Sequence, residues 1–235
     1  MKKFVGLLIV FVLAIVPLTV FMTGCGEDTP EENPNLSFTL NEEETGYTVR
    51  GKSAVKTTAT EIAIPAEYEG KPVIAISSKA FNGFTKLTKI TIPDSVKEIF
   101  SSAFENCNAL QSITIPDSVT SLGKNAFKGC NALTSAVIGS GLKSISENAF
   151  ENCKALTSVT FPAELEDIGK NAFLCCSSLE SVKFPEGLLS IGSYAFSQCY
   201  ALEEIKLPAS ITTIGDFAFG QNNGNEYPGS LLRAY

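Results

Sequence analysis

The residue type with the most reactive side chain in this sequence is cysteine. The chain of 235 residues has seven cysteines and no histidine. Five of the cysteines recur at intervals of 23 residues: Cys107, Cys130, Cys153, Cys176 and Cys199. Thiols bind zinc when CxxC pairs or histidines converge on one point, whereas one thiol per repeat spreads the ligands along a line. The spacing therefore predicts no metal site, and nothing else in the sequence indicates a cofactor.

The five periodic cysteines are predicted to lie in the core. In the first full repeat the same position holds Phe84, and a position that accepts either phenylalanine or cysteine is apolar. Disulfides between adjacent repeats are the alternative, because stacked Cα atoms about 5 Å apart are within disulfide range. Any such pairing would leave one of the five thiols over. The sequence leaves the reduced and the disulfide-bonded states open.

Cys175 lies outside this series. Its position holds glycine or a side-chain amide in the other repeats: Gly83, Asn106, Gly129, Asn152 and Gln198. Such a set is typical of an exposed turn with a positive φ. We expect an accessible thiol without a catalytic role, because no histidine is present to lower its pKa.

The sequence also lacks other signs of catalysis. It contains no GxSxG, HExxH, P-loop or EF-hand pattern, and its carboxylates are scattered without a convergent pair. The net charge of −7 provides no field that would attract nucleic acid phosphates. We therefore predict a protein that is not an enzyme and does not bind nucleic acid.

The amino terminus is typical of an export signal. Lys2 and Lys3 precede an apolar run over residues 4–22, and Thr23-Gly24-Cys25 follows. This pattern predicts a lipoprotein-type signal peptide over residues 1–24, with Cys25 as the lipid attachment residue. An uncleaved membrane helix is the alternative, because the run is just long enough to span a bilayer. Either interpretation predicts an exported protein anchored to the membrane, and the polar residues 25–35 are expected to form a disordered tether.

An Ala-Phe pair recurs every 23 residues and marks an internal repeat. Its seven phenylalanines, predicted to be core residues, are Phe81, Phe104, Phe127, Phe150, Phe173, Phe196 and Phe219. Within one repeat, Ile113 and Ile115 alternate with polar residues, which predicts a strand. Residues 126–133 carry apolar side chains at helical spacing, which predicts one or two helical or 3-10 turns. Gly123 is expected at the bend between the two, although Phe100 and Ser146 occupy its position in other repeats.

One repeat alone has too few apolar side chains to offset the entropy of ordering its backbone. Stacking the repeats buries both flat faces of each coil and pairs backbone groups along the stack. The sequence therefore predicts a solenoid of about seven 23-residue coils, with a parallel β-sheet on one face and short helical turns on the other.

The pattern LxxIxIPxxVxxIGxxAFxxCxxL, taken from residues 110–133, resembles the leucine-rich repeats of BspA-like bacterial surface proteins. Residues 45–76 also resemble the segment that opens the repeats in this family. The resemblance implies an α/β leucine-rich repeat solenoid over residues 61–220, a β cap over 36–60, and an irregular end over 221–235. It further implies a role at the cell surface in adhesion or in binding large extracellular ligands, without catalysis.

The outward positions of the predicted sheet form the candidate binding face. Hydroxyls dominate its first coils and charges its last two, and its candidate ligand-binding residues are Thr91, Ser112, Thr114, Ser135, Ser158, Thr160, Ser181, Lys183, Glu204 and Lys206. The alternative explanation is that threonine merely suits an exposed strand and that the charges pair across coils. The expected partner is an extracellular or host protein or glycan, held with modest affinity because tryptophan, tyrosine and arginine are missing from the face.

A structural role is the alternative function. The repeat pattern ends after Phe219 without a recognisable cap. Either residues 230–235 fold back as a last strand, or the final coil presents an open edge that pairs with another chain. In the second case the solenoid would be a spacer or assembly module that self-associates through its carboxyl-terminal edge.

Overall fold

The computed structural model describes residues 33–220 and the backbone of residues 232–234. The predicted signal peptide, Cys25, most of the predicted tether and residues 221–231 lie outside these described residues. In the described ranges, no helix has the length and apolar character needed to cross a membrane.

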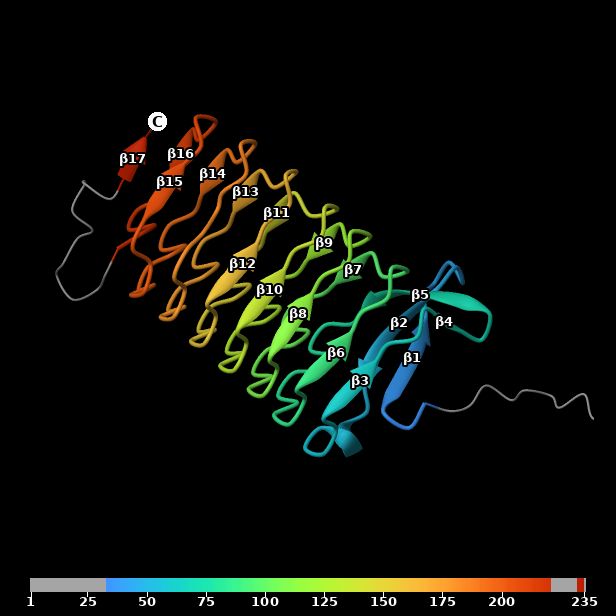
Figure 1. Cartoon of the computed structure of the whole chain (residues 1–235). Helices are drawn as coiled ribbons and strands as arrows, with labels where there is room; N and C mark the ends of the chain where they lie inside the picture. Colours follow the sequence, from blue (N-terminus) through green and yellow to red (C-terminus); the bar gives the residue numbers. More distant parts are fainter. Residues whose placement is uncertain (1–32, 221–231, 235) are drawn as a thin grey trace, which may run out of the picture. The chain divides into compact units, whose positions relative to one another are not determined.

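Residues 61–220 coil into a solenoid, as the repeat predicts (Figure 1). One ladder of parallel strands consists of β3 (Glu61–Ala63), β6 (Lys89–Thr91), β8 (Ser112–Thr114), β10 (Ser135–Val137), β12 (Ser158–Thr160) and β15 (Ile205–Leu207). In β8, β10 and β12 each residue is in register with the residue 23 positions away, so that Ser135 lies between Ser112 and Ser158, whereas β3 pairs with β6 at an offset of 28. Residues one repeat apart therefore lie side by side on one face.

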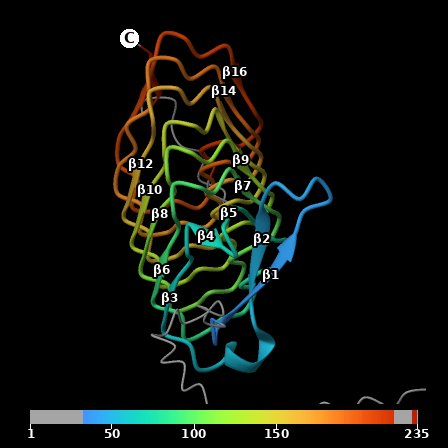
Figure 2. The same ribbon diagram turned by 90° about the vertical axis from the view of Figure 1, so that its right-hand side faces the viewer.

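A second ladder of parallel strands lies on the other side of the coils (Figure 2). It contains β5 (Lys71–Ile76), β7 (Glu98–Ile99), β9 (Ser121–Leu122), β11 (Ser144–Ile145), β13 (Asp167–Ile168), β14 (Ser190–Ile191) and β16 (Thr213–Ile214). From the sequence we expect a bend at Gly123 but no strand beside it. Two-residue strands are too short to produce a recognisable alternation of apolar and polar residues.

The predicted helical turns are wrong, and with them the α part of the α/β class. In the described residues the only helical segment is the 3-10 helix η1 (Ser53–Val55), which precedes the repeats. The cause is a residue with positive φ inside the predicted turns of six coils: Gly83, Asn106, Gly129, Asn152, Cys175 and Gln198. A second such residue directly precedes each Ala-Phe pair: Lys79, Ser102, Asn125, Asn148, Asn171, Tyr194 and Phe217. The left-handed conformation interrupts a helix. Successive backbone N–H groups bond alternately within their own coil and to the next coil. Lys128 donates to Asn125 O in its own coil at 3.1 Å, and Phe127 donates to Ala149 O in the next coil at 2.8 Å.

Glycine at the bend serves close packing between coils. Gly123 does not have a positive φ, but a Cβ placed on it would lie 2.3 Å from the backbone nitrogen of Ser101 in the preceding coil. No side chain fits at that distance unless the coils separate. The occupants Phe100 and Ser146 at the equivalent positions show that some coil pairs are spaced to allow one.

The core is a column of stacked aromatic rings. From Phe81 to Phe219 the ring centroids of successive coils lie 5.0 to 5.5 Å apart, and no pair of planes deviates by more than 10°. All seven rings are at most 6% exposed. The fixed 23-residue interval thus places identical side chains directly above one another.

The two ends of the solenoid differ. At the amino-terminal end, β1 (Leu36–Leu40) pairs antiparallel with β2 (Tyr47–Gly51), and β2 continues the second ladder next to β5. The short strand β4 (Glu67–Tyr68) also pairs with β5. These elements cover the first coil (Figure 2). At the other end, β17 (Leu232–Ala234) extends the first ladder beyond β15, whereas β16 pairs only with β14 in the part of the chain that the structure describes.

Candidate binding face

The candidate face is the outward surface of the first ladder: the outward side chains of β6, β8, β10, β12 and β15 and of residues 180–184. The alternation of each strand sends its central apolar residue, such as Ile113, into the core and its flanking residues outward. Nine of the ten candidate residues are exposed and Ser135 is half-buried. The register of β8, β10 and β12 brings the hydroxyls of Ser112, Ser135 and Ser158 together in one row. Thr114 and Thr160 lie on either side of Val137 in a second row, and Thr91 holds the equivalent position in β6.

Hydroxyl groups in the first ladder fall into two sets. Thr88, Thr134 and Thr157, which directly precede the strands, donate to backbone oxygens one coil back at 2.9 to 3.1 Å. The hydroxyls of the candidate face make no hydrogen bond to any of the described residues. The hydroxyls that precede the strands therefore serve the fold, whereas the hydroxyls of the candidate face are available to a ligand. The sequence alone did not reveal this distinction.

Val137 interrupts the threonine row at its centre. This side chain is 43% exposed and lies between Thr114 and Thr160 in the register. An apolar surface flanked by hydroxyls can contact an apolar group of a ligand while the hydroxyls orient it. Val137 is not among the candidate binding residues predicted from the sequence.

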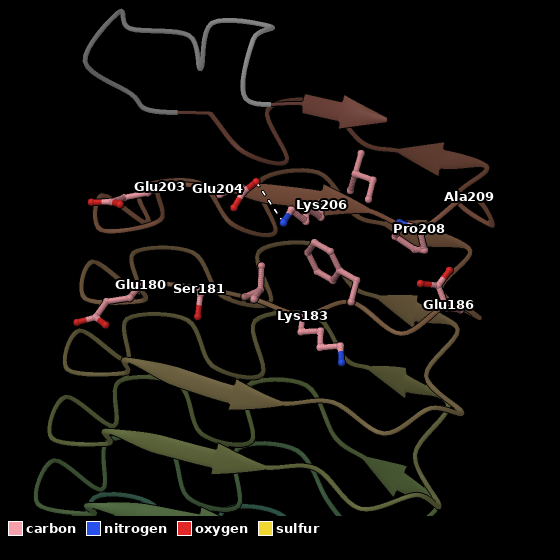
Figure 3. Close-up of a pocket in the computed structure, with 12 residues that line it drawn as sticks. Glu180, Ser181, Lys183, Glu186, Glu203, Glu204, Lys206, Pro208 and Ala209 are labelled. Carbon is pink, nitrogen blue, oxygen red and sulfur yellow. Dashed lines mark ion pairs between the residues drawn. The ribbon is translucent and has the colours of Figure 1, made fainter. Parts of the chain in front are cut away.

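The charged end of the face differs from the expectation that its charges pair across coils. Lys206 pairs with Glu204 of its own coil at 3.4 Å (Figure 3), and Lys183 makes no ion pair among the described residues. Ion pairs between coils do occur elsewhere, at 2.8 to 2.9 Å: Lys124 with Glu147, Lys128 with Glu151, and Lys143 with Glu166. The Lys124 ammonium lowers the pKa of the Glu147 carboxyl.

The periodic cysteines lie in the core as thiols, without disulfides. Each donates its S–H to the carbonyl oxygen of the Ala-Phe phenylalanine in the preceding coil, for example Cys130 to Phe104 O at 3.2 Å and Cys153 to Phe127 O at 3.3 Å. Burial raises the pKa of all five thiols, to about 12 for Cys107 and Cys199. Protonated thiols are neither nucleophiles nor metal ligands, so this column is structural.

Cys175 adopts the turn conformation expected from the sequence, with φ of 63°. Its side chain is half-buried, and its Sγ lies 3.2 Å from Oε1 of Gln198 in the next coil. Burial and Glu151 raise the pKa of this thiol, whereas Lys154 lowers it slightly. Cys175 is therefore the most accessible thiol of the described part, without the lowered pKa that a nucleophile needs.

Metal binding finds no support in the described part of the chain, where no three Cys, Asp or Glu side chains cluster closely enough to hold an ion. The candidate face contains hydroxyls, one exposed valine and a mixed-charge end. This composition suits recognition of a macromolecule through many weak contacts.

Comparison with known proteins agrees with the geometry. The sequence pattern of the BspA type leucine-rich repeat region matches residues 55–176 and 125–227, in six copies. A leucine-rich repeat protein from Eubacterium ventriosum ATCC 27560 has 30% identity and a TM-score of 0.66 over 80% of this chain and 53% of its own, so this chain spans about half of its length. The T. pallidum leucine-rich repeat protein TpLRR has 25% identity and a TM-score of 0.62 over 74% of this chain and 91% of its own. A search of curated proteins found no match. The repeat pattern covers well over half of the sequence, and the chain belongs to the BspA-type leucine-rich repeat family.

Proposed function

We propose that this chain is an exported bacterial surface protein whose candidate face binds an extracellular protein or glycan. Leucine-rich repeats of this family are generally binding modules without catalytic activity, which fits a surface role in protein binding or adhesion. The observation that carries the proposal is the set of hydroxyls in register over the three strands β8, β10 and β12 that the fold itself does not use.

The proposal includes anchoring through a lipid on Cys25 after removal of residues 1–24. It is supported by the two lysines, the apolar run and the Thr23-Gly24-Cys25 junction. Anchored copies at high surface density would convert modest single-site affinity into avidity. The unaltered chain should be labelled by radioactive palmitate, and Cys25→Ser should abolish this label. An unaltered chain that stays in the membrane fraction without label would instead indicate an uncleaved membrane helix.

The binding function is tested with the full chain on arrays of matrix proteins, host surface proteins and glycans. A triple variant with Thr91, Thr114 and Thr160 changed to alanine should weaken capture of a ligand by about tenfold or more, if each lost hydroxyl contributes about 0.5 kcal/mol. The matched control changes Ser121 and Ser144, which are exposed strand hydroxyls of the second ladder, and should bind normally. Absence of any ligand, or equal loss in both variants, would refute the candidate face.

A second function, assembly through the carboxyl-terminal end, is favoured by a different observation. Ile214 and Phe217 of the last coil are 41% and 58% exposed, whereas Ile191, one coil earlier, is 1% exposed. Among the described residues, β16 also has a paired strand on one side only. Light scattering of the full chain in detergent should detect association that Ile214→Lys abolishes. A particle of one chain per micelle at all concentrations would exclude this function.

A further inference from the structure

The last two coils contain a groove on the candidate face, which we call the acidic groove. It has a volume of about 760 Å³ and lies between residues 180–186 and 203–209 (Figure 3). We propose that the acidic groove binds an extended polypeptide segment in which a lysine or arginine stands two positions from an apolar residue, so that both side chains lie on the same side of the segment. The inference rests on the proposed function, because the groove is the carboxyl-terminal part of the candidate face.

The groove originates from two phenylalanines in the first ladder. Phe161 and Phe184 occupy the inward position that isoleucine holds in earlier coils, and their ring centroids lie 6.2 Å apart. Phe184 also packs edge-on against Phe196 of the main column, at 5.5 Å. These bulky rings fill more space between strand and column than isoleucine does, and the first ladder is interrupted beside them, between β12 and β15.

The backbone hydrogen bonds change at the same place. In earlier coils the amide of Ile115 donates to Val137 O at 2.9 Å and that of Ile138 to Thr160 O at 3.0 Å. The equivalent amides of Phe161 and Phe184, like that of Ile92 between β6 and β8, make no backbone hydrogen bond within the described ranges, and only the isolated bridge between Ser181 and Glu204 pairs residues 181–184 with β15. Peptide groups left without strand partners can pair with the main chain of a bound segment.

The groove combines an apolar floor with charged walls. Val182 and Phe184, which are 9% and 5% exposed, and the half-buried Leu207 form the floor. This volume is within the range of pockets that enclose one or a few side chains. An apolar side chain can therefore enter between the two coils while its backbone runs across the face.

The charges select a cation near that apolar residue. The lining contains four carboxylates and two ammonium groups: Glu180, Glu186, Glu203, Glu204, Lys183 and Lys206. Glu180 and Glu203 lie one above the other at one end of the groove, and neither makes an ion pair with a described residue (Figure 3). Two such carboxylates on adjacent coils fit one ammonium or guanidinium group. The excess of carboxylates also disfavours a phosphate-rich or sulfated ligand.

The test uses the absence of tryptophan from this chain. The probe is the peptide acetyl-Arg-Thr-Trp-Thr-Gly-amide, and acidic and neutral analogues replace its arginine with glutamate or serine. With the full chain in detergent micelles, the indole emission of a peptide that enters the groove should shift to shorter wavelength. We expect the arginine peptide to bind at least about tenfold more tightly than the glutamate peptide, because exposed charge pairs contribute up to about 1 kcal/mol each.

The variant Glu180→Gln/Glu203→Gln should reduce the arginine preference to less than about twofold, while the neutral peptide binds as before. Its matched control is Glu67→Gln/Glu98→Gln, which removes two exposed carboxylates from β4 and β7 and should retain the preference. Lys183→Ala should strengthen binding of the arginine peptide. Equal binding of all three peptides, no binding of any, or equal effects of both double variants would overturn the inference.

The two proposals fail in different ways. Capture of a surface ligand that is weakened by the threonine variants but unaffected by Glu180→Gln/Glu203→Gln refutes the acidic groove alone. A chain that captures no ligand from the arrays refutes the proposed function, whatever the peptides do.

Discussion

The interior and the candidate face repeat with the same 23-residue interval but use their polar groups differently. Inside, each periodic thiol donates to a phenylalanine carbonyl of the preceding coil. Asparagines near the turns also bond to one another, for example Asn148 to Asn125 at 2.9 Å. On the candidate face, the hydroxyls of strands β6, β8, β10 and β12 have no such partners in the described structure.

This difference teaches how to separate structural from functional repetition in a solenoid. A repeated residue that stabilises the stack can be recognised by a partner one coil away. A repeated residue without such a partner is not required by the stack, which leaves binding as a reason for its presence. The predictions below test whether interior positions affect stability and face positions affect binding only.

The largest effect is expected in the aromatic column. Phe127→Ala should lower the free energy of unfolding by about 3–5 kcal/mol, because the ring is fully buried between Phe104 and Phe150. Urea unfolding followed by circular dichroism measures the change. The control is Phe100→Ala, whose side chain is 41% exposed and which should cost less than about 1 kcal/mol. Similar costs for both variants would contradict the column as the main source of stability.

Close packing between coils predicts an opposite outcome for two identical substitutions. Gly123→Ala should destabilise by about 1–3 kcal/mol, because its Cβ would lie 2.3 Å from the backbone of Ser101. Gly187→Ala should be neutral or stabilise by up to about 1 kcal/mol, because the nearest atom to its Cβ is Ala163 O at 3.5 Å. The shift in melting temperature of each variant, relative to the unaltered chain, measures this difference. Equal shifts would mean that backbone contact between coils does not require glycine.

The buried thiols make the fold sensitive to alkali. Burial raises the pKa of Cys107 from its ordinary value of 9.0 to about 12. The neutral Cys107 thiol contributes fully to the free energy of unfolding below pH 9. This contribution is lost as the pH rises toward 12, because only the unfolded chain ionises the thiol in this window, and the loss is about 1.4 kcal/mol per pH unit. Stability of Cys107→Ala should therefore fall less steeply between pH 9 and 11. As a control, Cys175→Ala should change this slope less, because Cys175 is only half-buried. If Cys107→Ala left the pH dependence of the free energy of unfolding unchanged, Cys107 would not be a buried neutral thiol in the folded chain.

The sequence was sufficient to predict the solenoid and the identity of its coils. Ala-Phe at a fixed interval leaves few alternatives once one repeat is too small to fold alone. It was insufficient for the turns, where apolar spacing suggested helix. The signal that could have corrected this is the asparagine at positions 125, 148 and 171, since asparagine tolerates the left-handed conformation found there.

The candidate face was only partly predictable for a different reason. Strand alternation identifies which residues point outward, such as Thr114, but not whether a hydroxyl bonds to the neighbouring coil. The acidic groove lies beside the stacked rings of Phe161 and Phe184, where the pairing of strands is interrupted. Such packing consequences arise between coils and are not visible in the pattern of one coil.

The smallest effect separates two threonines that lie on one side of the molecule. Thr134 donates its hydroxyl to Gln111 O at 3.0 Å, so Thr134→Ala should cost about 1 kcal/mol of stability. The Thr114 hydroxyl has no partner in the described part of the chain, so Thr114→Ala should change stability by less than about 0.5 kcal/mol. Paired urea titrations under one condition resolve this difference, and Thr→Val at both positions controls for β-branching. If Thr114→Ala proved as costly as Thr134→Ala, its hydroxyl would serve the fold, and the case for the candidate face would lose the observation that carries it.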